Sequence, residues 1–152
     1  MKKVLILIAA LTISASLFAQ DYEKAIGIRF GGNASLNYKK FISSSNAVQV
    51  DLGLNNLLGD GGMSLLVSGT YLWHWDTQVQ GLSLYAGPGA SVGLRLGEAS
   101  GLALSIDGLA GIEYKIASLP IALSLDYRPQ INLIPGFGFY AMGIALGVKY
   151  TF

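Results

Sequence analysis

The sequence predicts an all-β protein: an eight-stranded antiparallel up-and-down transmembrane β-barrel. Three observations predict this fold class. Short segments in which apolar residues alternate with small or polar ones follow one another between turn-forming residues. Hydrophobic residues make up 52% of the chain and charged residues only 12%, against about 25% charged in an ordinary soluble domain. The final segment alternates strictly up to Phe152, as expected of a strand with one face toward lipid and the other toward a lumen.

A secretory signal precedes the alternating segments. Lys2 and Lys3 supply its positive charge, the following apolar stretch is too short to span a bilayer, and small residues come next. We expect cleavage between Ala19 and Gln20, with a retained N-terminal anchor as the alternative. The predicted domains are a signal peptide over residues 1–19 and an outer-membrane barrel over residues 20–152.

The charge and cysteine content of the mature chain exclude several classes of protein. Loss of the two signal lysines from the ten basic residues leaves eight against nine acidic ones, so no surface for nucleic acid is expected. The chain has no cysteine, which excludes a disulfide framework, a thiolate metal site and a lipid anchor on cysteine. No part of the mature chain offers the run of about 18 apolar residues that a membrane-spanning helix needs.

Eight alternating segments are expected to form the strands. The breaks between them are rich in Ser, Asn, Gly, Asp and Pro, the residues that turns favour. Each segment reaches the length of about 9–11 residues with which a tilted strand crosses a membrane. The segments are residues 24–32, 34–42, 47–55, 63–75, 82–96, 102–115, 121–129 and 137–152.

The alternation differs in quality along the chain. The first two segments are the least regular, whereas the third, the fifth and the last place apolar and small residues cleanly on opposite faces. Leu66 and Leu72 interrupt the small face of the fourth segment, and the sixth alternates as far as Lys115. Pro120 opens the seventh, where its missing N–H costs little. Pro88 lies inside the fifth and predicts a bulge or a bend there.

Two all-β arrangements can bury such faces. In a soluble lipocalin-like barrel the apolar face points inward around a ligand and the outside is polar. In a membrane barrel the two faces are exchanged. The second face here consists mainly of Gly, Ser and Ala with a few charges, which is too little charge for a solvated wall. It suits the narrow interior of an eight-stranded barrel, which side chains just fill.

The charged residues on the small face nearly balance. Because a buried charge without a partner costs several kcal/mol, we predict an ion-pair network that plugs the lumen, with a proton or ion path as the alternative. Glu113 and Lys115 lie two residues apart on this face, as do Asp126 and Arg128, and Lys149 needs an acid such as Asp107, Glu113 or Asp126. The predicted network comprises Arg29, Lys39, Asp51, Arg95, Asp107, Glu113, Lys115, Asp126, Arg128 and Lys149.

Aromatic residues are expected to mark both membrane interfaces. With both termini in the periplasm, the fourth, sixth and eighth segments end on the periplasmic side, and each carries aromatic residues there on its apolar face. Tyr127 and Tyr140 are expected near the opposite rim. The predicted periplasmic girdle is Trp73, Trp75, Tyr114, Tyr150 and Phe152.

Residues 18–20, 71–75, 106–115 and 124–129 resemble segments of small outer-membrane β-barrel proteins of the Bacteroidota type. In size the chain is similar to the OmpA-like and OmpX-like eight-stranded barrels. The resemblance implies export across the inner membrane and residence in the outer membrane of a Gram-negative bacterium, in a close family without an assigned activity. It also implies that Tyr150 and Phe152 belong to the assembly signal that the outer-membrane assembly machinery reads.

His74 is the single histidine and the one candidate for catalysis. Lipid A acyl-chain hydrolases and acyltransferases of the outer membrane need a serine, a base and an orienting acid within hydrogen-bond reach. Asp76 is expected on the same face of the strand as His74, and Ser83 can lie across the hairpin. His74, however, would face a filled lumen, away from a lipid substrate. We therefore predict a structural histidine at the periplasmic rim and no catalytic residue. One histidine without clustered carboxylates predicts no metal site, and no cofactor is expected.

The predicted function is that of a non-catalytic integral outer-membrane barrel with a structural or interaction role. The alternatives are a lipid A-modifying enzyme and a soluble periplasmic lipid-binding barrel. Expected partners are outer-membrane lipids and lipopolysaccharide, and, during biogenesis, the assembly machinery and periplasmic chaperones; the protein is expected to be a monomer. Eight strands leave no continuous channel. The outer connections near 31–34, 57–62, 97–101 and 129–136 are short, and only the last, with Gln130–Ile134, offers apolar residues that can touch lipid or a partner.

Overall fold

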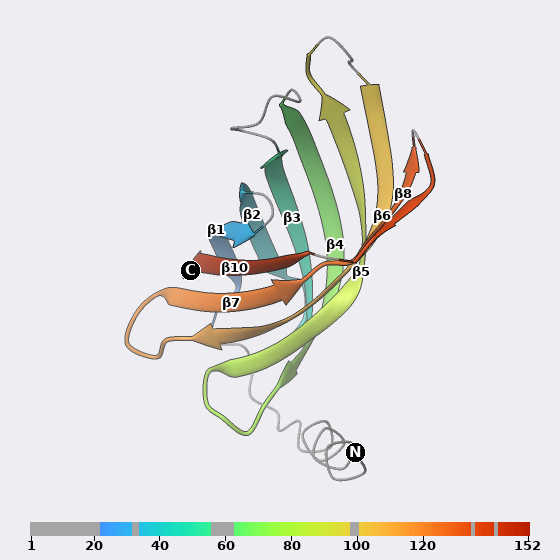
Figure 1. The fold of residues 1–152 in the computed structure, drawn as a ribbon. Coiled ribbons are helices and arrows are strands. Elements are labelled where there is room, and N and C mark those ends of the chain that lie inside the picture. The colour runs from blue at the N-terminus through green and yellow to red at the C-terminus, as the bar shows by residue number, and fades with distance from the viewer. Residues whose placement is uncertain (1–21, 32–33, 56–62, 98–100, 135, 142) are drawn as a thin grey trace, which may run out of the picture.

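In the computed structural model the strands form a closed antiparallel barrel (Figure 1). The structure describes residues 22–31, 34–55, 63–97, 101–134, 136–141 and 143–152, so the predicted signal peptide and its cleavage site lie outside the described residues. The strands are β1 (Lys24–Gly31), β2 (Ala34–Phe41), β3 (Asn46–Asn55), β4 (Ser64–Asp76), β5 (Leu82–Arg95), β6 (Gly101–Lys115), β7 (Ile121–Tyr127), β8 (Gln130–Ile134), β9 (Gly138–Tyr140) and β10 (Ile144–Thr151). Within the described ranges, no helix is long and apolar enough to cross a membrane.

The ring has eight wall positions. Its order is β1, β2, β3, β4, β5, β6, β7, β10 and back to β1. β7 and β8 share one position, because β7 pairs with the second half of β6 and β8 with its first half. β9 pairs with β8 and leads into β10. The predicted eight-stranded antiparallel barrel is therefore confirmed.

The first and last strands lie side by side and close the ring. Their register runs without a break from Ala25 opposite Thr151 to Gly31 opposite Ala145. At the end of the seam the N–H of Lys24 donates to the carbonyl of Phe152 over 2.9 Å, and the N–H of Phe152 donates back over 2.8 Å. This pairing removes the open sheet edge that a hydrocarbon environment does not tolerate. We call the end of the barrel that holds Lys24 and Phe152 the terminal end, and the opposite end the loop end.

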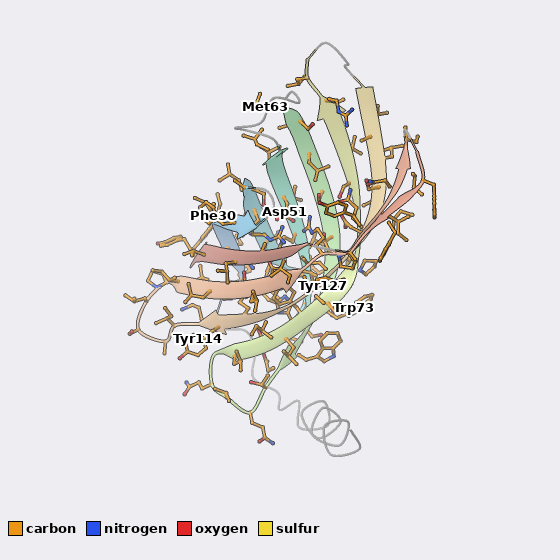
Figure 2. All side chains as sticks on the ribbon, in the orientation of Figure 1. Phe30, Asp51, Met63, Trp73, Tyr114 and Tyr127 are labelled. Carbon is orange, nitrogen blue, oxygen red and sulfur yellow. The ribbon has the colours of Figure 1, made fainter. Side chains whose placement is uncertain are left out.

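Alternation decides which side chains face the lumen. Along β10, exposed and buried residues follow each other in strict turn: Ile144 and Leu146 are exposed, whereas Ala145 and Lys149 are buried. The other strands keep the same parity, so large apolar side chains cover the outside and polar ones fill the inside. Figure 2 shows this distribution, with Asp51 inside the ring. The observed exposure is inverted relative to a soluble barrel and matches a membrane barrel.

Three expectations about the chain from Tyr127 onward are wrong. The predicted eighth strand over residues 137–152 is divided into β9, which pairs with β8, and β10, which closes the ring. Gln130–Ile134 was expected to be an outer connection, but it forms β8 and continues the wall beyond the break at Pro129. Its apolar residues resume the alternation, and a register shift beside Ser105 of β6 absorbs the irregularity. Tyr127 consequently lies midway along the shared β7–β8 position (Figure 2) and not near a rim. Much of the other predicted outer connections lies outside the described residues.

Pro88 produces a gap in pairing and no bulge. β4 and β5 keep one register on both sides of the gap, with Thr70 opposite Gly89 and Trp73 opposite Ala86. No extra residue is therefore inserted, and the two strands merely lose two pairs. A Cβ atom on Gly87 would overlap the carbonyl oxygen of Tyr71, so the glycine allows β4 and β5 to approach closely where the proline cannot donate.

Candidate functional site in the barrel lumen

Charged side chains inside the barrel form two clusters. The lysine cluster, near the terminal end, consists of Tyr22, Lys39, Glu113 and Lys149. The arginine cluster consists of Arg29, Asp51, Asp126 and Arg128. Seven of these eight residues are buried, and the side chain of Arg128 is only 10% exposed. Alternation places their side chains inward, and neighbours from different strands then satisfy one another, as buried charges require.

Glu113 is the centre of the lysine cluster. Its Oε2 lies 2.8 Å from the ammonium nitrogen of Lys39 and 2.7 Å from that of Lys149, and the hydroxyl of Tyr22 donates to its Oε1. One carboxylate thus serves two ammonium groups. The ring of Tyr85 lies 4.7 Å from the Lys39 nitrogen and 5.4 Å from the Lys149 nitrogen, and its π face partly offsets the surplus positive charge.

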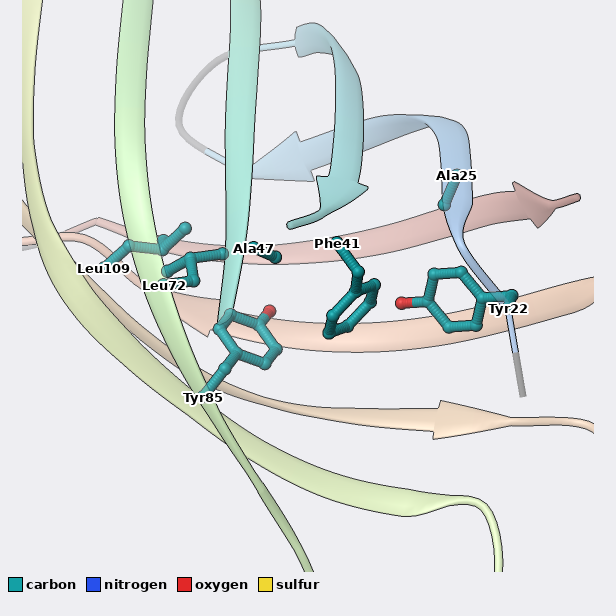
Figure 3. Packing of buried hydrophobic residues seen from close by; sticks show 7 residues of the cluster. All are labelled: Tyr22, Ala25, Phe41, Ala47, Leu72, Tyr85 and Leu109. Carbon is teal, nitrogen blue, oxygen red and sulfur yellow. The ribbon is translucent and has the colours of Figure 1, made fainter. Parts of the chain in front are cut away.

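A layer of aromatic and aliphatic side chains packs beside the lysine cluster (Figure 3). The ring of Phe41 contacts Tyr22 edge-on at 5.3 Å between centroids and His74 at 4.7 Å. His74 in turn stacks on Tyr85 at 5.1 Å. A Cβ atom on Gly111 would lie 2.6 Å from the Tyr85 hydroxyl, so the glycine leaves room for this ring. The hydrophobic core of the molecule therefore lies inside the barrel, next to the ion pairs.

The arginine cluster is electrically balanced. Arg29 donates from Nε to Oδ2 of Asp126 over 2.6 Å, and its Nη1 lies 3.9 Å from Oδ1 of Asp51. Arg128 donates from Nη2 to Oδ2 of Asp51 over 2.5 Å. Gln49 adds contacts of 3.1 and 3.2 Å from its amide nitrogen to the same carboxylate. Two cations and two anions therefore neutralise one another across β1, β3 and the β7–β8 wall.

Three residues of the predicted network lie elsewhere or bind differently. Arg95 is exposed at the loop end of β5. Lys115 donates to the carbonyls of Ile116 and Leu119 over 2.9 and 2.7 Å, at the turn after β6. Asp107 is buried and accepts a hydrogen bond from Ser91, without an ion pair in the described part of the chain.

The pairings differ from those that neighbouring positions suggested. Glu113 binds Lys149, which is one of the pairs expected for that lysine, and Lys39 rather than Lys115. Asp126 binds Arg29 rather than Arg128. Alternation along one strand tells whether a side chain points into the lumen or outward. Which residues meet across the lumen depends on the register between all eight neighbouring strands of the ring. Tyr22, which sequence reasoning missed, precedes the first alternating segment and so carried no parity signal.

His74 packs in the aromatic layer beside the lysine cluster. Its ring is buried, its Nε2 lies 3.5 Å from the ammonium nitrogen of Lys39, and its Nδ1 has no hydrogen-bond partner among the described residues. In the described part of the chain no carboxylate therefore holds Nδ1, in contrast to the base of a serine hydrolase. Across the described ranges no group of three or more His, Cys, Asp or Glu side chains is arranged to hold a metal ion.

The predicted girdle residues all lie on the outside of the barrel. Tyr150 and Phe152 contact each other on the outer face of the seam, with ring centroids 6.0 Å apart. Trp73 contacts Tyr71 of the same strand at 5.2 Å. The exposed fractions of Trp73, Trp75, Tyr114, Tyr150 and Phe152 are 43%, 41%, 43%, 54% and 56%.

A closed eight-stranded ring with an apolar outside and a polar, ion-paired inside defines the class of transmembrane β-barrels. Among solved structures, the chain is similar to the N-terminal β-barrel domain of Pseudomonas aeruginosa OprF, with a TM-score of 0.64 and 16% identity over 85% of this chain and 95% of that chain. It is also similar to Neisserial surface protein A (NspA), with a TM-score of 0.59 and 15% identity over 85% of this chain and 93% of that chain. No family model and no curated protein sequence matches the chain. At these identities the likeness establishes the fold.

Proposed function

We propose that this protein is a non-catalytic integral barrel of the bacterial outer membrane, with a structural or interaction role and a lumen plugged near its terminal end. The observation that carries the proposal is the lysine cluster. Lys39, Glu113 and Lys149 come from β2, β6 and β10, which occupy separate wall positions, so their ion pairs cross the lumen. Tyr22 and the aromatic layer pack beside these ion pairs. The interior of an eight-stranded barrel is narrow enough for such side chains to close.

The proposed location and orientation rest on the sequence together with the fold. The predicted signal peptide would deliver the chain to the periplasm, and both termini would remain on that side. The girdle aromatics would then lie at the periplasmic interface, in contact with membrane lipids. Membership of a Bacteroidota-type family, the assembly signal at Tyr150 and Phe152, and contacts with lipopolysaccharide stay predictions. Fractionation tests the location: recovery in outer membranes, with heat-modifiable gel migration, is expected, whereas recovery in the soluble periplasm would contradict it.

Conductance across a planar bilayer tests the plug. The wild-type barrel is expected to give no steady ion current. The triple variant Lys39→Ser, Glu113→Ser, Lys149→Ser removes the cluster without stranding a charge, and it is expected to conduct because the cross-lumen side chains are shortened. Arg95→Ser, which changes an exposed residue outside both clusters, is the matched control and is expected to stay silent. A wild-type current as large as that of the folded triple variant would refute the plug.

The enzyme alternative predicts a chemical change that the proposed function does not. Mass spectrometry of lipid A from cells that express the wild type, His74→Ala or no protein is expected to give one and the same acylation pattern, because no carboxylate in the described ranges holds Nδ1 of His74. A pattern that depends on the wild-type protein and is lost in His74→Ala would establish the enzyme instead.

A further inference from the structure

A cavity of about 300 Å³ lies within the barrel beside the arginine cluster. Its volume falls at the lower end of the about 300–1,000 Å³ typical of small-molecule sites. No member of the lysine cluster lines it, so it is separate from the proposed plug. The side chains that matter for recognition are Arg29, Asp51, Arg128, Gln130, Asn132 and Tyr140.

The charges around this cavity favour a neutral ligand. Arg29 and Arg128 are each bonded to an aspartate, Asp126 and Asp51, at 2.6 and 2.5 Å. An anion or a cation would have to compete with one of these partly dehydrated pairs, and leaving one member of such a pair without its partner is strongly unfavourable. A neutral molecule can bind while both pairs stay intact.

The cavity nevertheless presents hydrogen-bonding groups of both kinds. Gln130 donates to Ser105 and to the amide oxygen of Asn132 over 2.7 and 2.9 Å. These bonds fix the two amide side chains in place, and the amide nitrogen of Asn132 carries two further N–H donors. The carboxylate of Asp51 supplies acceptor lone pairs on the same cavity.

One donor in the cavity wall is left without a partner. The Nε of Arg128 is buried and has no hydrogen-bond partner among the described residues. Leaving a buried donor in this state is energetically unfavourable. Because this Nε is itself buried, a ligand oxygen could accept from it only after a local shift of the Arg128 side chain, whose Nη2 is bonded to Asp51.

Apolar groups complete the lining. Leu66 and Tyr140 border the same space as the polar groups. A ligand that meets all of these must carry hydroxyl groups, which both donate and accept, together with C–H surfaces that can rest on apolar side chains. A sugar ring combines the two.

We propose that this cavity binds a neutral hexose, either as a free sugar or as the headgroup of a glycolipid. The mixture of fixed donors and acceptors, the neutralised charges and the unpartnered Nε of Arg128 all fit this ligand class. The proposal goes beyond the structural role proposed above and does not depend on the plug, because the two occupy different parts of the lumen.

Nuclear magnetic resonance of the ¹⁵N-labelled barrel tests the proposal. The barrel is refolded in phosphocholine micelles, because glucoside or maltoside detergents would compete for the site. D-Glucose, D-galactose, D-mannose and N-acetyl-D-glucosamine are titrated separately, with glucose 6-phosphate and inorganic phosphate as charged counterparts. At least one neutral sugar is expected to shift the Arg128 Nε–H and the Gln130 and Asn132 side-chain amide signals in a saturable way. No shift with any of the four sugars, or saturation by the charged compounds only, would overturn the proposal.

Substitutions separate specific binding from general perturbation. Gln130→Ala and Asn132→Ala are each expected to weaken sugar binding at least tenfold. Ser83→Ala, at a buried lumenal position that does not line the cavity, is the matched control and is expected to bind as the wild type does. If either amide variant fails to give the heat-modifiable folded form, Tyr140→Ala, at an exposed position, replaces it. Binding unchanged in every folded cavity variant would refute the site.

Nanodiscs distinguish the two sources of the sugar. Discs that contain monogalactosyl diacylglycerol are compared with discs of the same composition without the sugar headgroup. Shifts of the same three side-chain signals in the glycolipid discs would support a lipid-borne headgroup. Shifts with free sugar only would support a soluble ligand. The absence of shifts in both experiments would contradict the proposal, while conductance and fractionation would still test the plug and the location independently.

Discussion

At the residue scale, Glu113 holds the interior together. It is the only carboxylate within ion-pair distance of Lys39 and Lys149 in the described ranges, and all three side chains are completely or almost completely buried. Tyr22 adds a hydrogen bond from the segment before β1. A single carboxylate thus connects the N-terminal segment, β2, β6 and β10, which makes the stability of the barrel unusually sensitive to its charge.

The first prediction is that Glu113→Gln strongly destabilises the barrel. The amide keeps the shape of the side chain but leaves two buried ammonium groups without a counter-charge, and breaking a buried pair in this way costs about 3–5 kcal/mol. Urea unfolding of the refolded protein in detergent measures the change in the free energy of unfolding. Glu23→Gln, at an exposed position, is the control and is expected to change it little. Equal stability of Glu113→Gln and the wild type would show that the cluster is not ion-paired in solution.

Individual residues also show which features of the lumen the sequence could predict and which it could not. The alternation correctly placed Lys39, Glu113 and Lys149 on the inner face, because side chains in a strand change face at every residue. It also placed Arg95 and Lys115 there, yet these lie at strand ends, where long side chains reach solvent or turn carbonyls. The height of a side chain along the barrel axis, and the residue that it meets across the lumen, depend on the register between strands. The sequence of a single strand does not determine that register.

Within the β4–β5 pair of strands, alanine substitutions at two glycines are expected to differ in their effect on stability. Gly87→Ala would push a Cβ atom into the Tyr71 carbonyl, whereas a Cβ atom on Gly69 would meet no atom within 4 Å. Forced overlap in a packed structure costs about 1–3 kcal/mol. Gly87→Ala is therefore expected to lower the urea midpoint, and Gly69→Ala to leave it unchanged. Equal effects of the two substitutions would contradict the close approach of β4 and β5.

The seam between β1 and β10 gives a prediction about register. Ile28 lies directly opposite Val148, and the natural chain has no cysteine. The double variant Ile28→Cys, Val148→Cys is expected to form a disulfide under mild oxidation in the folded barrel, detected by gel migration before and after reduction. In Ile28→Cys, Leu146→Cys the second cysteine lies two residues away along β10, and cross-linking is expected to be weak. Equal cross-linking of both pairs would refute the register.

The lengths of the strands also explain why the chain after β7 forms a strand and not the expected connection. Pro129 stands between two short apolar runs, and a proline in such a place is typical of a connection. The structure instead resumes the strand at Gln130, because β6 is long enough to pair with β7 along one half and β8 along the other. The length of a partner strand, which no local pattern of residues 121–134 reveals, decided the outcome.

At the scale of the whole molecule, the distribution of polarity is the property that the sequence predicted best. The same alternation of apolar and polar residues, most regular in β3, β5 and β10, places the apolar face on the outside all around the ring. Two features of the interior required the three-dimensional structure. Tyr22 completes the lysine cluster from outside the alternating segments, and the cavity beside Arg128 exists only because β8 carries Gln130 and Asn132 into the wall.

The central claim is that the apolar face of this barrel meets lipid. The chain has only two tryptophans, Trp73 and Trp75, and the structure places both on the outside near the terminal end, 43% and 41% exposed. Fluorescence of the barrel reconstituted in vesicles of brominated phospholipid measures their contact with acyl chains. An apolar face in contact with lipid predicts strong quenching by lipid-bound bromine and weak quenching by aqueous iodide. Emission that brominated lipid leaves unchanged would contradict it, because a barrel with its apolar face turned inward would shield both side chains from the bilayer.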